Sequence, residues 1–157
     1  MSSKETKKEE LFEHVASNDF LKFAFNGASY EASLQRAIHR TGRLCAISVT
    51  ERTLSDGRKV IWMAHDFKFL GGSLGTAEGE KLVLGFERGL QKRIPVVVEC
   101  RSGGARMQEG TQSLMQMAKI SVAVRALRSV QPAVPFISVL QAPTYGGVSA
   151  SYAMQSD

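Results

Sequence analysis

The sequence predicts an α/β fold assembled from repeated strand–helix units. Apolar, β-prone segments occur at residues 60–69, 94–101 and 134–140. A glycine pair follows each segment, and a helical pattern follows each pair. The pairs consist of Gly71 and Gly72, Gly103 and Gly104, and Gly146 and Gly147. Because they lie roughly 30 to 45 residues apart, they recur at the spacing of strand–helix repeats rather than of chance composition.

A helix and a β-hairpin are predicted ahead of the first glycine pair. The helix covers residues 29–41, because four apolar positions share one helical face and Gly42 is placed to end it. Those positions are Tyr30, Leu34, Ala37 and Ile38. The hairpin joins strands at residues 44–50 and 59–65 through turn residues at 55–57.

The helix after the first glycine pair is predicted to end near residue 91, and the helix after the second pair near residue 130. The helix after the third pair is predicted to begin at Val148. The middle helix is predicted to carry one face made of Leu114, Met117, Ala118, Ser121 and Val124. The methionines of this region are interpreted as core filler rather than as ligands. They are Met107, Met115 and Met117.

Composition and length indicate one globular domain. The chain has 157 residues, of which 43% are apolar and 22% charged, so a mainly disordered protein is excluded. Residues 1–28 are predicted to form a tail or docking segment, and residues 29–157 the domain. No apolar run approaches the roughly 20 residues that span a bilayer, and the charged N-terminus lacks the apolar core of a secretory signal. We therefore expect no membrane association.

The net charge and the two cysteines limit the classes of partner and the cellular compartment that we expect. The formal net charge of +5 suits a phosphate-bearing ligand, an acidic partner or a solvated surface, but no basic cluster is dense enough to indicate nucleic-acid binding. Cys45 and Cys100 lie in apolar, strand-like segments and are interpreted as buried free thiols of a reducing compartment. Cytoplasm is the expected location, with a plastid as the alternative. Two cysteines cannot build a four-cysteine zinc site.

The glycine pairs are the strongest candidates for function. A strand-to-helix turn exposes main-chain N–H groups that attract negative charge, and glycine allows a ligand to approach the backbone closely. In a layered fold, the turns at residues 103–104 and 146–147 would aim their amides at one point, the geometry of an oxyanion hole. A single such turn is more often structural, so the recurrence carries the hypothesis.

Other site chemistries fit the sequence poorly. Residues 71–75 match the G-x-S-x-G nucleophile elbow, but the catalytic histidine of that fold follows the serine. All three histidines, His14, His39 and His65, precede it and show no metal-ligand spacing. No phosphate loop and no dinucleotide-binding turn is present. The choice left open is electrostatic catalysis by the main chain or no catalysis.

Three long motifs resemble one enzyme family. Residues 69–81, 102–119 and 135–154 closely resemble the β subunit of bacterial and plastid acetyl-CoA carboxylase carboxyltransferase, and the likeness extends over residues 29–157. The resemblance implies a crotonase-like (ClpP/crotonase) fold of stacked ββα units, here its N-terminal part. It also implies transfer of a carboxyl group from carboxybiotin to acetyl-CoA, which gives malonyl-CoA.

The resemblance assigns roles to residues and implies partners. Gly103 and Gly104 would form an oxyanion hole, and Gly146 and Gly147 would line the same cavity. Arg106 would orient a phosphate or carboxylate, or alternatively form a salt bridge that fixes its loop. Gly71 and Gly72 would shape the mouth of the coenzyme A site. The implied partners are the carboxyltransferase α subunit, or the remaining half of the domain, and a biotin carboxyl carrier protein.

The sequence departs from the family pattern in two ways. The four-cysteine zinc ribbon of typical β subunits is absent, so no zinc is expected, and the chain stops inside the third predicted helix. We therefore expect the missing half to come from another chain or from a fuller protein. Two alternatives stay open: a biotin-independent malonyl-thioester decarboxylase of the same fold, and a non-catalytic subunit of a carboxylase complex.

Overall fold

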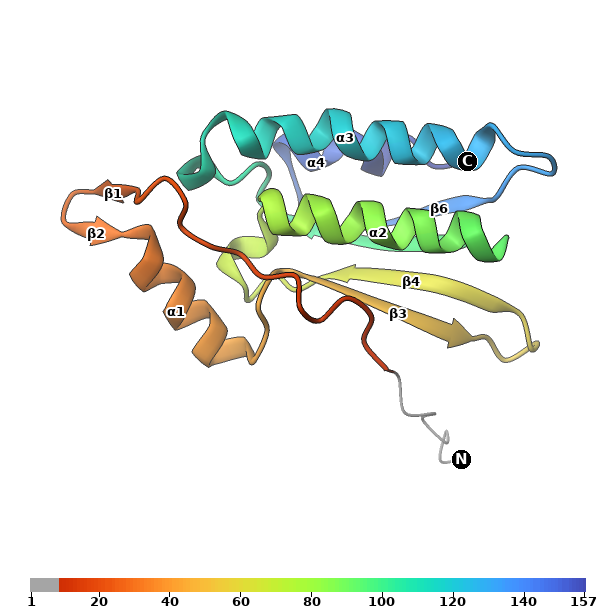
Figure 1. The fold of residues 1–157 in the computed structure, drawn as a ribbon, viewed down its shortest axis with the longest axis horizontal. Helices are drawn as coiled ribbons and strands as arrows, with labels where there is room; N and C mark the ends of the chain where they lie inside the picture. Colours follow the sequence, from red (N-terminus) through yellow and green to blue (C-terminus); the bar gives the residue numbers. More distant parts are fainter. Residues whose placement is uncertain (1–8) are drawn as a thin grey trace.

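A four-stranded mixed sheet forms the centre of the protein. The computed structural model describes residues 9–157 (Figure 1). The sheet has the order β3-β4-β5-β6, with β3 and β4 antiparallel and the other neighbours parallel. Its strands are β3 (Ile47–Thr53), β4 (Lys59–His65), β5 (Val96–Ser102) and β6 (Phe136–Thr144). The predicted hairpin is confirmed as β3 and β4, which pair from Ile47 opposite His65 to Thr53 opposite Lys59.

Two long helices lie side by side over one face of this sheet. They are α2 (Thr76–Lys92) and α3 (Thr111–Arg128), and both were predicted to follow a glycine pair (Figure 1). The main apolar core lies between these helices and the sheet, where the rings of Phe86 and Phe136 meet edge to face with centroids 4.9 Å apart. Burial of such side chains contributes about 2 kcal/mol each, which makes this layer the main source of stability.

The first predicted helix is confirmed as α1 (Tyr30–Thr41). The hydroxyl of Ser29 accepts the amide of Ala32 at 3.0 Å and caps its start. Gly42 ends it in the left-handed conformation, with φ of 67°, and donates its amide to Ile38 at 2.7 Å. The buried face of α1 packs against Phe69 in a second, smaller apolar cluster.

The predicted face of α3 is only partly correct. Val124 is buried and Met117 packs against the main core as predicted, whereas Leu114 and Ala118 are exposed. The buried positions are Ser113, Gln116, Ile120, Val124 and Leu127. The cause is the contact with α2, since the Gln116 side chain fills the space over Gly79 and turns this polar side inward. The core-filler prediction also fails for Met107 and Met115, whose side chains are 82% and 60% exposed.

The helix that follows the third glycine pair is much shorter than the helices that follow the first two pairs. It is α4 (Gly146–Ser149), and it opens two residues before the predicted position. Ser151 leaves the helical conformation with φ of −127° and ψ of −121°, and a separate 3-10 turn follows at Tyr152–Met154. These two short pieces carry Val148 and Tyr152 into the main core.

The segment that precedes the domain lies along the sheet edge. Glu10 bridges to Thr50 of β3, and the amide of Leu11 donates to Val49 at 2.7 Å. The amide of Ser17 donates to Leu44 at 2.9 Å, and a small hairpin of β1 (Ala24–Phe25) and β2 (Ala28–Ser29) follows. From residue 9 onward, the predicted tail therefore makes contacts with the domain, while residues 1–8 lie outside the described part of the chain.

Residues 9–157 contain neither a membrane-spanning helix nor a cluster of metal-ligating side chains. In that range no helix is both long and apolar enough to cross a bilayer. The same range contains no group of three or more His, Cys, Asp or Glu side chains that could hold a metal ion.

Candidate functional site

The three glycine turns meet at one end of the sheet. The amide of Gly103 donates to the carbonyl oxygen of Gly71 at 2.9 Å, which joins the turns after β4 and β5. A Cβ atom placed on Gly104 would lie 3.6 Å from the Cα of Gly146 and 3.7 Å from the nitrogen of Gly147, so the turns after β5 and β6 also touch. We call this meeting point the glycine junction. It comprises residues 71–72, 103–105 and 146–147.

The two predicted catalytic amides already have acceptors within the chain. Gly103 donates to Gly71, as described, and Gly104 donates to the hydroxyl oxygen of Ser102 at 3.1 Å. The expectation that both amides are free for a ligand therefore differs from the structure. The amide of Gly103 is taken because neighbouring turns bond to one another, and the amide of Gly104 is taken by a side chain of its own turn.

Other amides of the junction are unpaired. Within residues 9–157, the N–H groups of Ala105, Gly146 and Gly147 meet no hydrogen-bond acceptor. Leu74 donates to Gly104 at 2.8 Å and accepts the amide of Arg106 at 2.9 Å, so the Ala105 amide lies on the side away from Leu74. A Cβ on Gly147 would lie 3.7 Å from the Ala105 nitrogen. Unpaired donors of two turns thus gather in one place.

The first glycine pair shapes a left-handed turn. Leu70, Gly71 and Gly72 have φ values of 47°, 67° and 62°. A Cβ on Gly72 would overlap the carbonyl oxygen of Arg101, so only glycine fits there. Nδ1 of His65 lies 3.0 Å from the carbonyl oxygen of Gly72 and binds the end of this turn.

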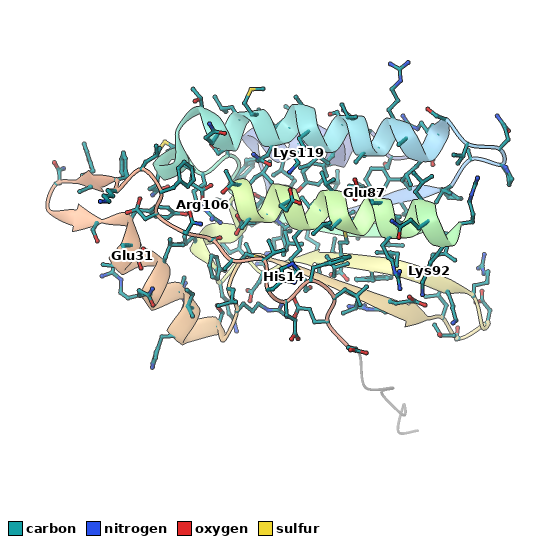
Figure 2. The ribbon with its side chains drawn as sticks, viewed as in Figure 1. His14, Glu31, Glu87, Lys92, Arg106 and Lys119 are labelled. Atoms are coloured by element: carbon teal, nitrogen blue, oxygen red, sulfur yellow. The ribbon has the colours of Figure 1, made fainter. Side chains whose placement is uncertain are left out.

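Arg106 is buried beside the junction, near the start of α2 (Figure 2). Its Nη2 donates to Glu78 Oε1 at 2.7 Å, and its Nη1 to Glu109 Oε1 at 3.1 Å. Of the two roles expected for Arg106, the structure shows the salt bridge that fixes the loop. Burial favours a raised pKa for Glu78, but the Arg106 guanidinium outweighs burial and lowers the pKa of that carboxyl group.

Sequence reasoning missed several polar side chains around the junction. His65 and Tyr152 share a hydrogen bond of 2.6 Å, and burial lowers the pKa of His65 to about 4. Glu109 accepts the amide of Thr76 at 2.6 Å and the hydroxyl of Tyr30 at 2.6 Å. The only available signal was position, since His65 ends a predicted strand and Glu109 follows the second glycine pair closely.

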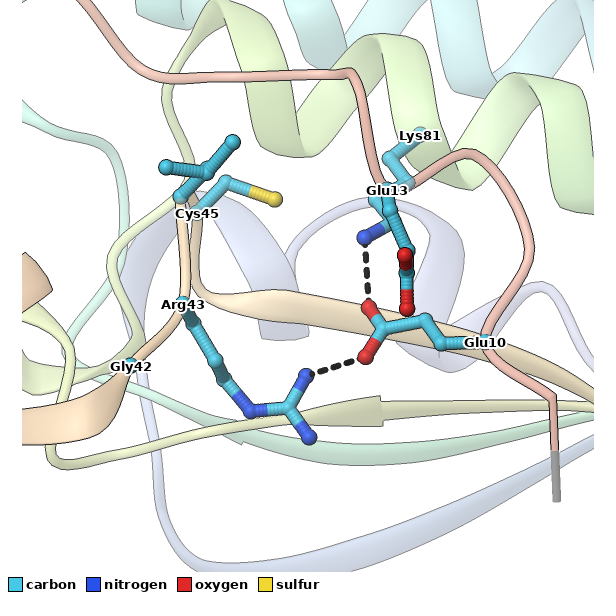
Figure 3. A pocket seen from close by; sticks show the side chains of 7 residues that line it. Glu10, Glu13, Gly42, Arg43, Cys45 and Lys81 are labelled. Atoms are coloured by element: carbon cyan, nitrogen blue, oxygen red, sulfur yellow. Dashed lines mark hydrogen bonds and ion pairs between the residues drawn. The ribbon is translucent and has the colours of Figure 1, made fainter. Parts of the chain in front are cut away.

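Among the pockets formed by residues 9–157, two that lie outside the glycine junction are lined in part by the N-terminal segment. One, of about 240 Å³, is polar, and Glu10 spans it to reach both Lys81 and Arg43 (Figure 3). The other has a volume of about 420 Å³ and a mostly apolar lining. Met107, the residue after Arg106, is part of that lining. This pocket is lined by Phe23, Phe25, Ala28, Ser29, Tyr30, Ser33, Met107 and Gln108.

The sequence matches known proteins over nearly its whole length. Residues 22–156 match the family described as carboxyl transferase domain. The chain is 44% identical over 149 residues to the acetyl-coenzyme A carboxylase carboxyl transferase subunit beta of Pelobacter propionicus. That alignment covers 95% of this chain and 51% of the relative. The chain thus spans about half the length of the curated relatives it matches.

Solved structures show the same fold. Transcarboxylase 12S, with methylmalonyl-coenzyme A and methylmalonic acid bound, superimposes with a TM-score of 0.72 at 27% identity, over 96% of this chain and 26% of that one. The MdcD-MdcE hetero-dimer of Pseudomonas malonate decarboxylase gives 0.59 at 28% identity, over 67% and 47%. The expected crotonase-like fold is therefore confirmed, and the chain belongs to the carboxyl transferase domain family.

Proposed function

We propose that this chain is a carboxyltransferase component of a biotin-dependent acyl-CoA carboxylase that moves a carboxyl group from carboxybiotin to acetyl-CoA. The observation that carries the proposal is the group of unpaired amides of Ala105, Gly146 and Gly147 at the glycine junction. The 44% identity to a β subunit of acetyl-coenzyme A carboxylase carboxyl transferase supports the choice of substrate.

The chemistry requires donors for a developing oxyanion. When the thioester loses its α-proton, negative charge builds on its carbonyl oxygen, and fixed main-chain N–H groups stabilise that charge. We assign this role to the amides of Ala105 and Gly147, which come from two different turns. Loss of one such donor typically lowers kcat by about 100- to 1000-fold. Gly103 and Gly104 then act by building the turn that presents Ala105.

We further propose biotin as a co-substrate that a partner protein carries and that supplies the carboxyl group. Its ureido oxygen also acquires negative charge during the transfer and needs donors of its own, because the amides of Ala105 and Gly147 are taken by the thioester oxygen. We expect the α subunit to supply those donors. The α subunit and a biotin carboxyl carrier protein are the proposed partners, since the relatives are subunits of larger enzymes.

The reverse reaction tests the proposal. With the α subunit present, the protein should carboxylate a biotin analogue at the expense of malonyl-CoA. Gly104→Ala places a methyl group 3.4 Å from the carbonyl oxygen of Tyr145, at φ of 109°, and should lower the rate about 100-fold. Gly57→Ala is the matched control, since its φ of 83° imposes similar strain in the distant β3–β4 turn. Equal rates for the two variants would contradict the proposal.

A second function is favoured by one observation. The similarity to the malonate decarboxylase hetero-dimer, at 28% identity, supports a biotin-independent decarboxylase that uses the same amides. Release of carbon dioxide from malonyl-CoA without a biotinylated carrier would establish it. Failure of the assembled complex to bind coenzyme A would instead indicate a non-catalytic subunit.

A further inference from the structure

The side chain of Arg106 connects segments that lie far apart in the sequence. Nε donates to the hydroxyl of Ser73 at 3.0 Å, and Nη2 donates to the carbonyl oxygen of the same residue at 2.8 Å. Nη2 also donates to Glu78 of α2, and Nη1 donates to Glu109. The side chain is 1% exposed, so these groups replace water completely.

The remaining contacts extend to the N-terminal segment and α1. Nη1 donates to the hydroxyl of Ser17 at 3.0 Å and to that of Tyr30 at 3.2 Å. We call the whole set the Arg106 network. It consists of Arg106, Glu78, Glu109, Tyr30, Ser73 and Ser17.

Burying the charged groups of this network costs free energy, so the network is a costly source of stability alone. One guanidinium and two carboxylates are buried together, and burial of ions is often no more stabilising than apolar packing. Burial acts to lower the pKa of Arg106, but Glu78 and its neighbours raise it above its ordinary value, so the guanidinium stays charged. A buried charge that forms a planar fork fixes direction, because each N–H demands an acceptor at a set angle.

The Arg106 network also holds the backbone around Ala105 in place. Arg106 holds both the hydroxyl and the carbonyl oxygen of Ser73. The next residue, Leu74, accepts the amide of Arg106 and donates to Gly104. The chain on both sides of Ala105 is thus tied to Leu74, and the Arg106 side chain holds the residue before Leu74. This ring of contacts leaves the Ala105 amide directed to the opposite side.

We propose that Arg106 is a positioning residue that fixes the direction of the Ala105 amide through Ser73 and Leu74, without contacting substrate. The proposal rests on the proposed function for its kinetic consequence. It also assigns a task to the N-terminal segment, because Ser17 supplies one of the acceptors that hold the guanidinium.

Arg106→Lys tests the proposal, because lysine keeps the positive charge but lacks the planar guanidinium fork. In the reverse carboxyl transfer, kcat should fall about 100-fold, the effect of a misplacement near 1 Å, while KM for malonyl-CoA changes less than about twofold. Ser73→Ala removes one acceptor and leaves both carboxylates in place, so kcat should fall about tenfold. Arg43→Lys is the matched control, since Arg43 pairs with Glu10 and Asp66 outside the network.

A result in which KM rises and kcat is unchanged would overturn the proposal, because it would place Arg106 on the substrate. Equal kcat values for the Arg106 and Arg43 variants would overturn it as well.

A readout without turnover separates this inference from the proposed function. In ¹H–¹⁵N spectra of the full chain, Arg106→Lys and Ser73→Ala should shift the amide resonances of Ala105 and Gly147, whereas Arg43→Lys should not. Unchanged resonances in a folded Ser73→Ala protein would refute positioning even if the wild-type enzyme is active. A wild-type protein without carboxyl transfer would refute the proposed function, and the spectra would still decide the role of Arg106.

Discussion

The hydroxyl of Tyr152 lies 2.6 Å from Nε2 of His65, although the two residues are far apart in the sequence. Nδ1 of the same ring faces the carbonyl oxygen of Gly72, which can only accept. The proton of the neutral imidazole therefore resides on Nδ1, and Tyr152 donates to Nε2. The pair links the first glycine turn to the segment after α4. Burial raises the pKa of Tyr152, so its hydroxyl remains a donor.

Stability should fall in mildly acidic solution because of His65. Burial lowers its pKa to about 4 in the folded protein, against 6.5 in the unfolded chain. Between those pH values the unfolded state binds more protons, so the free energy of unfolding decreases as pH falls, by about 3 kcal/mol over the window. Urea unfolding at about pH 7 and about pH 5 should show about 2 kcal/mol of this decrease, because pH 5 lies inside the window. The variant His65→Phe should lose this dependence, and an equal slope in both proteins would disprove the cause.

The two cysteines should be inert in the folded protein. Burial raises the pKa of Cys45 to about 11 and that of Cys100 to about 12, and both are free thiols. Because the thiolate is the reactive form, neither should react with a thiol reagent at about pH 8 until the protein unfolds. Counting modified thiols with and without urea by mass spectrometry tests this. Rapid labelling of either residue in native buffer would contradict the buried assignment.

The predictable parts of the fold depend on local chemistry. Gly42 ends α1 because the chain there needs a positive φ, and the three glycine pairs mark turns that meet at one sheet end. The apolar runs that became β4, β5 and β6 were equally visible, since strands covered by helices read as continuous apolar segments. Such signals need no knowledge of distant residues.

The parts that could not be predicted depend on contacts between distant residues. Nothing near Arg106 in the sequence indicates that Glu78 and Tyr30 surround it, or that its fork binds Ser73. The buried face of α3 was partly misassigned because a small residue on α2 admits the polar Gln116. Which amides are free was also misassigned, because Gly71 and Ser102 take the amides of the second glycine pair.

Glu10 should anchor the N-terminal segment through charge. Its carboxylate lies 2.6 Å from Nζ of Lys81, whose side chain is 3% exposed, and 3.0 Å from Nη1 of Arg43. Glu10→Gln leaves the buried ammonium without its counterion and should cost about 2 kcal/mol, below the value for a fully buried pair because Glu10 is partly exposed. Urea unfolding measures the loss. Adding Lys81→Met should recover part of it, and no recovery would argue against an unpaired charge as the cause.

The first glycine turn should distinguish two adjacent substitutions. Gly71 and Gly72 have similar positive φ values, so alanine imposes similar backbone strain at either, about 1 kcal/mol. At Gly71 the added methyl group meets open space, whereas at Gly72 it overlaps the carbonyl oxygen of Arg101 in β5. Because main chain cannot yield as a flexible side chain does, Gly72→Ala should cost about 3 kcal/mol more than Gly71→Ala. Comparison of the two unfolding free energies tests this, and equal losses would show that the turn can move away from β5.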